Sequence, residues 1–222
     1  MANEDLETLI EKLEAEISKL PVGTNIIVLR MYLDNIKKRH LSEMAELEAE
    51  LKNLRHKVRH DSLTDLGNYI KLEETLHNYQ SQKKPVTIIN LDLKGLKTVN
   101  DKYGYDSGND LIKLAAQYLS AQSTTRSTDM VFRAGEMADE FYVLTEEINP
   151  NNIKKFIIRL IENAKKHRLH IKHGDDYEDV YLGFYSGYAV YDGVKSMTAV
   201  KKDAHTGVVQ SKTEAKGSYS RK

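Results

Sequence analysis

The first sixty residues place apolar side chains three or four positions apart, which is the spacing of one face of an α-helix. Between residues 4 and 20 this stripe is formed by Leu6, Leu9, Ile10, Leu13, Ile17 and Leu20. A proline and a glycine then interrupt the pattern, and Thr24 or Asn25 can cap a second helix. The start of that helix, residues 26–29, is apolar on every side. We therefore expect a helical hairpin or a partner subunit to cover it.

A heptad pattern follows later in the second helix, between residues 44 and 58. Its apolar positions are Met44, Leu47, Leu51, Leu54 and Val58, and charged residues stand beside them. This spacing is typical of a coiled coil, which at this length needs support from other helices. We expect the seam to join two copies of the chain in a parallel homodimer. A helix packed against its own domain is the other interpretation.

From residue 61 onward, helix-like and strand-like segments alternate. The expected helices cover residues 69–79, 110–121, 150–166 and 195–212, and the expected strands cover residues 86–92, 130–133, 140–144 and 180–191. Residues 99–101 are expected to form an asparagine-rich turn. The two middle strands are separated by a short loop and should form a hairpin. This order predicts an α/β domain over residues 61–222, with helices flanking a sheet, behind a helical region over residues 1–60.

Composition limits the classes of protein that these elements can form. The 222 residues include 33 basic and 33 acidic side chains, so no net charge favours a nucleic-acid partner. The absence of cysteine excludes disulfides, thiolate metal sites and cysteine nucleophiles. The acidic N-terminus lacks the pattern of a signal peptide, and no apolar run approaches the roughly 20 residues of a membrane span. We therefore expect a soluble, cytoplasmic protein.

Three motifs stand in order along the expected α/β domain. Residues 61–68 are DSLTDLGN, residues 91–104 are LDLKGLKTVNDKYG, and residues 133–141 are RAGEMADEF. In order and spacing they resemble the patterns D-x-L-T-x-L-x-N, D-x-D-x-F-K-x-x-N-D-x-x-G and R-x-G-G-D-E-F of the GGDEF family of diguanylate cyclases. The resemblance implies a palm-type, ferredoxin-like nucleotidyl cyclase sheet. It also implies a two-fold dimer that condenses two GTP molecules into cyclic di-GMP.

The resemblance further assigns roles to single residues. Asp139 and Glu140 correspond to the catalytic acids, and Mg²⁺ would be held by Asp92, the backbone carbonyl of Leu93 and Glu140. The positions implied to bind the nucleotide are Lys97, Asn100, Asn109 and Lys212. The alternative is that the three acids are solvated strand-end side chains and that Lys212 is a surface lysine.

A regulatory motif is also implied. Arg126 and Asp129 form an R-x-x-D pattern seven residues ahead of Arg133. In the family, this pattern at this spacing resembles an inhibitory site for cyclic di-GMP, and arginine suits bidentate contacts with phosphate or guanine. The simpler interpretation is that Asp129 caps the turn before the strand.

Four departures from the family pattern bear on activity. Lys94 replaces the second aspartate of D-x-D and brings an ammonium group beside the expected metal. Met137 and Ala138 replace two glycines in a loop that is two residues longer. Asn109 replaces an aspartate that reads guanine, which leaves one base donor unmet at a cost of roughly 1–3 kcal/mol and suits adenine instead. The C-terminal signature survives only faintly over residues 204–212.

These departures favour a degenerate GGDEF domain in cyclic di-GMP signalling. It would bind GTP, cyclic di-GMP or a protein partner, with weak or no cyclase activity. One alternative is an active diguanylate cyclase with an unusual loop. Another is a scaffold whose N-terminal helices carry the function.

Overall fold

The computed structural model describes residues 6–21, 23–123, 129–134, 139–174 and 176–219. The chain divides into two compact units, Met1–His56 and Lys57–Lys222. Each unit is described by itself below. No described helix combines the length and the apolar composition that a membrane crossing needs.

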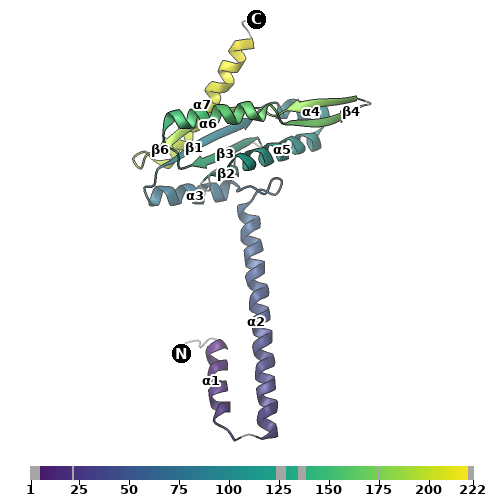
Figure 1. The fold of residues 1–222 in the computed structure, drawn as a ribbon, viewed down its shortest axis with the longest axis vertical. Helices are drawn as coiled ribbons and strands as arrows, with labels where there is room; N and C mark the ends of the chain where they lie inside the picture. The colour runs from purple at the N-terminus through teal and green to yellow at the C-terminus, as the bar shows by residue number, and fades with distance from the viewer. Residues whose placement is uncertain (1–5, 22, 124–128, 135–138, 175, 220–222) are drawn as a thin grey trace. The chain divides into compact units, whose positions relative to one another are not determined.

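The first unit is a helical hairpin. Helix α1 (Leu6–Ser18) lies beside the first part of α2 (Thr24–Arg59), as Figure 1 shows. Ile10, Ile17 and Leu33 are buried between the two helices. A hairpin is therefore present, but it does not cover the apolar start of the second helix as expected, because Ile27, Val28 and Leu29 stay 45% to 53% exposed.

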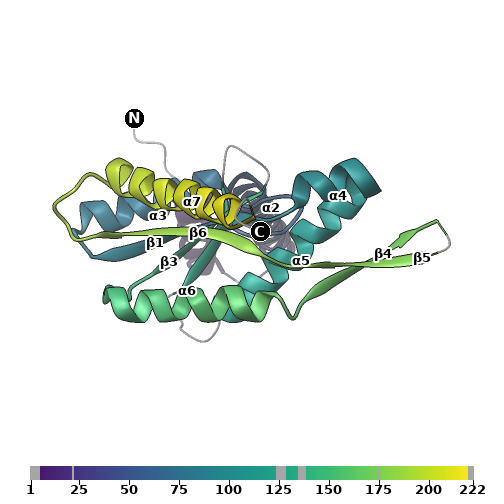
Figure 2. The same cartoon turned by 90° about the horizontal axis from the view of Figure 1, so that it is seen from above.

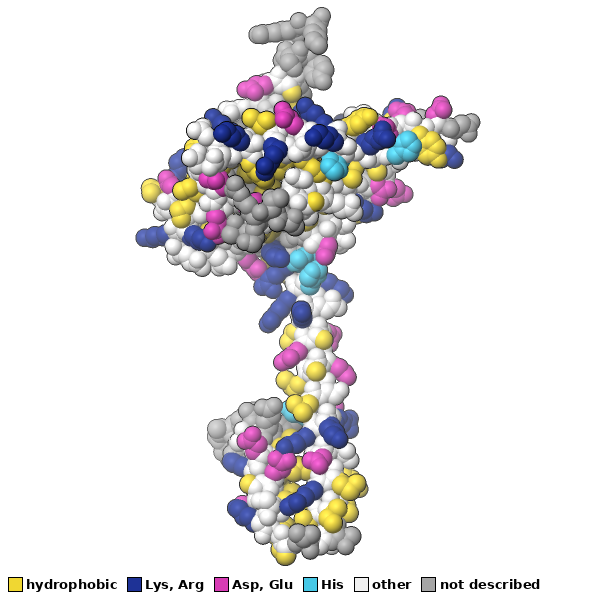
Figure 3. Space-filling model, viewed as in Figure 1, with side chains coloured by type: hydrophobic (Ala, Val, Ile, Leu, Met, Phe, Trp, Pro, Cys, Tyr) yellow, Lys and Arg dark blue, Asp and Glu magenta, His cyan; other side chains and the backbone are white. Residues whose placement is uncertain are grey.

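The heptad positions of α2 are exposed. Met44, Leu47, Leu51, Leu54 and Val58 expose between 43% and 55% of their surface. Figure 3 shows such apolar side chains on the surface of the helices, interspersed with charged ones. An exposed seam is what a coiled coil presents before it pairs, and the homodimer stays a prediction.

The second unit contains a four-stranded antiparallel sheet with the strand order β2-β3-β1-β6. The strands are β1 (Val86–Leu93), β2 (Met130–Arg133), β3 (Glu140–Thr145) and β6 (Phe184–Tyr191). Strands β4 (Arg168–His173) and β5 (Asp176–Tyr181) form a separate hairpin that extends away from the main sheet (Figure 2).

Helices cover both faces of the sheet. Helices α3 (Tyr69–Ser81) and α7 (Met197–Tyr219) lie on one face, and α5 (Tyr105–Ser123) and α6 (Pro150–Ala164) pack on the other (Figure 2). In β1, Ile89 and Leu91 point to α5 and α6, while Ile88 points to α3 and α7. Because side chains alternate along a strand, Asn90 and Asp92 face the α3–α7 side.

Two glycines bring α7 close to the sheet. A Cβ atom on Gly187 of β6 would lie 2.1 Å from the carbonyl oxygen of Ala204 and 2.5 Å from the backbone nitrogen of Val208. A Cβ on Gly207 of α7 would lie 2.8 Å from the Cα of Gly187. The backbones of α7 and β6 are therefore in direct contact, which only glycine allows at these positions.

The structure corrects three expectations about the elements. The predicted turn over residues 99–101 belongs to a helix, α4 (Leu96–Tyr103), which lies between a left-handed Gly95 and Gly104 and buries Leu96 and Val99. Helix α5 begins at Tyr105 rather than at residue 110. The single strand expected over residues 180–191 is two strands, because β5 pairs with β4 and β6 pairs with β1.

Candidate active site

The acidic residues singled out in the sequence lie at one end of the sheet. Asp92, near the end of β1, is the cross-strand partner of Glu140, the first residue of β3. The backbone N–H of Leu93 donates a hydrogen bond to the carbonyl oxygen of Asp139 at 3.0 Å. The predicted catalytic and metal-binding acids are therefore brought together, although 47 positions separate Asp92 from Asp139 in the chain.

Asp92 and Glu140 are buried, with 5% and 9% of their surfaces exposed. Burial is the largest influence on each and raises the pKa of both carboxyl groups above its ordinary value. The negative charge of Asp139 raises both pKa values further, while cations on α7 oppose the shift. The fold thus holds these acids where their charge costs free energy, as is common at functional sites.

Helix α7 places a basic side chain beside each of the two buried acids. The ammonium group of Lys212 lies 2.5 Å from Oδ2 of Asp92. The ring Nδ1 of His205 lies 3.4 Å from Oε1 of Glu140. His205 and Lys212 are seven residues apart, which is two helical turns, so both side chains project from the same face of α7. Lys212 was singled out in the sequence; His205 was not, although this spacing was a signal for it.

Lys94 is held beside the acids by an aromatic ring. Its ammonium group lies 4.2 Å from the ring centroid of Tyr185, and Tyr185 is the cross-strand partner of Asp92 in β6. The backbone N–H of Lys94 donates to the carbonyl oxygen of Gly183 at 2.9 Å. Burial, and then the charge of Lys165, lower the pKa of Lys94. The half-buried Lys94 therefore lies on the ring of Tyr185, the residue opposite Asp92 in the sheet.

A buried polar chain lies behind Glu140. The side-chain amide of Asn90 donates to the hydroxyl of Tyr142, which in turn donates to Oε2 of Glu140, both at 3.3 Å. Two buried oxygens here accept no hydrogen bond from the described residues: Oδ1 of Asn90 and Oδ1 of Asp139. A buried acceptor of this kind is costly unless a ligand or solvent satisfies it.

The two asparagines expected to read the base lie on neighbouring helices. A Cβ at Gly108 would fall 1.8 Å from Oδ1 of Asn100, so the side chain of Asn100 rests against Gly108. Asn109 follows directly, and both asparagines are half-buried. Gly104 joins α4 to α5 with a positive φ of 86°. Lys97 is exposed in the first turn of α4.

The first motif, residues 61–68, is tied to the strand that precedes the acids. Both carboxylate oxygens of Asp61 accept from Nη1 of Arg133 at 2.9 Å. Asp61 also accepts from the backbone and the hydroxyl of Thr64, at 3.0 and 2.6 Å. Asn68 caps α3 and donates to the carbonyl oxygen of Val58 at 2.8 Å. The motif therefore links the end of α2 to β2.

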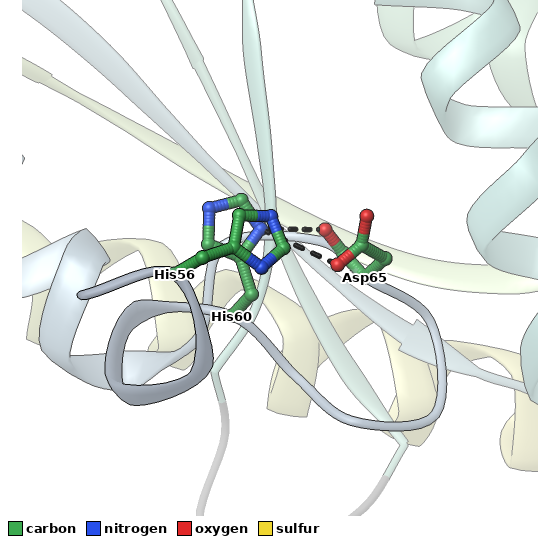
Figure 4. A group of neighbouring side chains, drawn as sticks. All are labelled: His56, His60 and Asp65. Atoms are coloured by element: carbon green, nitrogen blue, oxygen red, sulfur yellow. Dashed lines mark hydrogen bonds and ion pairs between the residues drawn. The ribbon is translucent and has the colours of Figure 1, made fainter. Parts of the chain in front are cut away.

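A histidine closes the loop of the first motif. Figure 4 shows His60 beside Asp65, whose carbonyl oxygen accepts from Nδ1 of His60 at 2.8 Å. The ammonium group of Lys71 lies 3.0 Å from Nε2 of the same ring. Because a lysine can only donate, this arrangement assigns the ring proton to Nδ1. Asp65 adopts a positive φ of 59°, which the tight loop requires.

Comparison with known proteins identifies this arrangement. The family model for "Diguanylate cyclase, GGDEF domain" matches residues 58–218. The chain belongs to the GGDEF family. Its sheet, flanking helices and preceding helical region also match solved GGDEF structures. The coiled coil and GGDEF domain of DgcB from Caulobacter crescentus, solved with c-di-GMP, gives a TM-score of 0.71 at 19% identity, over 82% of this chain and 95% of that one.

Curated relatives share only part of their length with this chain. The cyclic di-GMP phosphodiesterase NbdA of Pseudomonas aeruginosa is 31% identical over 141 residues, covering 59% of this chain and 18% of NbdA. The diguanylate cyclase DgcS of Shewanella oneidensis is 38% identical over 90 residues, covering 39% of this chain and 29% of DgcS. The chain therefore spans less than a third of the length of these relatives.

The implied Mg²⁺ ligands of the GGDEF domain can be tested against the geometry. Asp92, the carbonyl of Leu93 and Glu140 are oxygen donors, which Mg²⁺ prefers. However, the two carboxylates are already paired with Lys212 and His205. Among the described residues, the carboxylates of Asp92, Asp139 and Glu140 do not all lie within 4.8 Å of one another. The donor chemistry suits Mg²⁺, but the arrangement does not fit a preformed Mg²⁺ site.

Two sequence expectations involve residues that the structure does not describe. Arg126 of the R-x-x-D motif lies outside the described residues, as do Met137 and Ala138 of the lengthened loop. Asp129 is described and half-buried, and the guanidinium of Arg133 pairs with Asp61. The regulatory site for cyclic di-GMP stays a prediction.

Proposed function

We propose that this GGDEF domain acts in cyclic di-GMP signalling by binding a guanine nucleotide, GTP or cyclic di-GMP, with weak or no cyclase activity. The observation that carries the proposal is the contact of both buried acids with basic side chains of α7. Catalysis of phosphoryl transfer needs acids that hold metal ions against the phosphates. Acids that are already contacted by Lys212 and His205 are less suited to that task and leave a site for binding.

The relatives support the choice of nucleotide. NbdA is named a cyclic di-GMP phosphodiesterase and DgcS a diguanylate cyclase. The two activities differ, and cyclic di-GMP is the compound common to both names. A site for this nucleotide or its precursor therefore suits a domain that resembles both proteins.

Calorimetric titration of the full chain tests the proposal. GTP, cyclic di-GMP and ATP are titrated separately, and we expect heat of binding from at least one guanine nucleotide. Asn100→Ala, which removes one expected base contact, should weaken that binding roughly 10-fold, the effect of losing one hydrogen bond. Asn78→Ala, at an exposed position in the last turn of α3, is the control. The absence of heat with both guanine nucleotides would refute the proposal.

An active diguanylate cyclase is the second candidate, because the acid pair is intact. Asp92 and Glu140 stand in register, and the buried Oδ1 of Asp139 is ready to accept a hydrogen bond. Mg²⁺ held by Asp92, Leu93 and Glu140 belongs to this candidate. It would require Lys212 to move away from Asp92.

A dimeric scaffold is the third candidate, because the heptad seam of α2 is exposed. The double variant Leu47→Glu with Leu51→Glu in the full chain places charges in the seam. We expect it to lower the mass measured by analytical ultracentrifugation from that of a dimer to that of a monomer. Glu46→Lys, outside the seam and its flanking e and g positions, should leave the mass unchanged. Equal masses for wild type and double variant contradict dimerisation through this seam.

A further inference from the structure

Two lysines, Lys94 and Lys212, contact a single aromatic ring, that of Tyr185. The ammonium groups of Lys94 and Lys212 lie 4.2 Å and 5.8 Å from the ring centroid of Tyr185. Tyr185 is half-buried and lies directly across the sheet from Asp92. One wall of the acid site therefore presents two positive charges, as many as one divalent ion carries.

Both lysines retain donors that a ligand can use. A lysine ammonium group has three N–H donors. Lys212 uses a donor on Asp92, and its side chain is 40% exposed. Among the described residues, Lys94 forms no ion pair with a carboxylate, and its ammonium group rests on the π-face of Tyr185. Such a contact leaves N–H donors directed away from the ring.

Lys94 is placed where a positive charge is poorly compensated. It is half-buried, and its ammonium group shares the ring of Tyr185 with that of Lys212. Two like charges held around one ring lower their energy when an anion binds between them. Phosphate groups carry this charge and accept several hydrogen bonds, and lysine binds them as a point charge.

We propose that Lys94 and Lys212 bind the phosphate groups of a guanine nucleotide directly, in place of a divalent metal ion. The inference rests on the proposed nucleotide site and explains how that site works although its acids do not form an Mg²⁺ site. Lys212 bridges Asp92 and a phosphate oxygen. Lys94, whose ammonium group lies on the ring of Tyr185, contributes the second positive charge. Nucleotide binding is then independent of Mg²⁺.

Titration of the full chain with GTP, in EDTA and in Mg²⁺, tests this inference. We expect GTP to bind in EDTA with an affinity similar to that in Mg²⁺. Lys94→Met keeps the apolar stem on Tyr185 but removes the charge. It should weaken binding in EDTA roughly 10-fold to 100-fold, the range for one hydrogen bond to a charged group. Lys94→Asp should abolish binding in EDTA and restore it in part with Mg²⁺.

The chain offers a matched control at the opposite end of the sheet. Lys84 also pairs with a carboxylate, Glu146, and lies 5.6 Å from the ring centroid of Tyr79. Lys84→Met should leave GTP affinity unchanged. Thermal unfolding of each variant checks that it is folded, and Lys94→Arg, which keeps the charge, should retain binding in EDTA if Lys94→Met is unstable.

The outcomes separate this inference from the proposed function. GTP binding that requires Mg²⁺, or binding that Lys94→Met does not weaken, overturns the inference and leaves the nucleotide site in place. Binding of cyclic di-GMP without binding of GTP also overturns the inference and leaves the proposed nucleotide site in place. If neither nucleotide binds with or without Mg²⁺, both the inference and the proposed function are wrong.

Discussion

Asp61→Ala removes the carboxylate that joins the first motif to β2. The wild-type side chain accepts two hydrogen bonds from Arg133 and two from Thr64. The side chains of Asp61 and Arg133 are only 20% and 13% exposed, so solvent can replace little of what is lost. Removal of one partner from a buried ion pair typically costs 3–5 kcal/mol. Because Asp61 keeps some contact with water, we expect the lower end, about 3 kcal/mol.

Thermal unfolding of the full chain measures this loss. A change of about 3 kcal/mol lowers the Tm of a domain of this size by roughly 6–12 °C. Asp110→Ala is the matched control, because Asp110 forms an exposed ion pair with Lys113. Asp110→Ala should lower the free energy of unfolding by no more than about 0.5 kcal/mol. If Asp61→Ala and Asp110→Ala shift the Tm equally, the buried pair does not stabilise the domain as described.

The same pair predicts a dependence on pH. Burial is the largest single influence on Asp61 and raises its pKa, but the bonds from Thr64 and Arg133 outweigh burial and hold the pKa below 3.8. A carboxylate with a lowered pKa stabilises the fold above its unfolded pKa and loses this effect as pH falls through its folded pKa. The stability difference between wild type and Asp61→Asn should therefore be full at neutral pH and shrink below pH 3.8.

Three further predictions concern the acid site and its supports. Glu140→Gln should raise the Tm at neutral pH, because burial raises the pKa of Glu140 and its charged form destabilises the fold. This gain should disappear below the ordinary pKa of 4.5, and a lower Tm at neutral pH would contradict the prediction. Gly187→Ala should lower the unfolding free energy by about 3 kcal/mol or more, because its Cβ would collide with the backbone of α7, whereas a neutral effect would show that α7 is seated elsewhere. Asn109→Asp should raise the ratio of GTP affinity to ATP affinity roughly 10-fold. If calorimetry finds the same affinity ratio for wild type and variant, Asn109 does not contact the base.

The periodic segments of this chain were predictable, and the short irregular ones were not. The helix in residues 69–79 and the strand in residues 86–92 were recognised because strong apolar patterns reflect burial. Helix α4 was missed because it has eight residues, contains poor helix formers such as Thr98 and Asn100, and is stabilised by packing of Leu96 and Val99.

The acids of the site could be predicted, and their partners could not. Asp92 and Glu140 were found through sequence motifs. Their pairing with His205 and Lys212 depends on how α7 sits on the sheet, and Lys212 is 120 residues away from Asp92 in the chain. No local pattern reports such a contact. The contact of Lys94 with the ring of Tyr185 likewise joins residues that are distant in the chain.

The most direct test of the account is a cyclase assay on the full chain. Purified protein is incubated with GTP and Mg²⁺, and cyclic di-GMP is measured by mass spectrometry over time, with Glu140→Gln as the control. We predict that GTP binds and that little or no cyclic di-GMP forms. Glu140→Gln should barely change the amount of cyclic di-GMP. Sustained turnover that Glu140→Gln abolishes would show that this GGDEF domain is a working diguanylate cyclase.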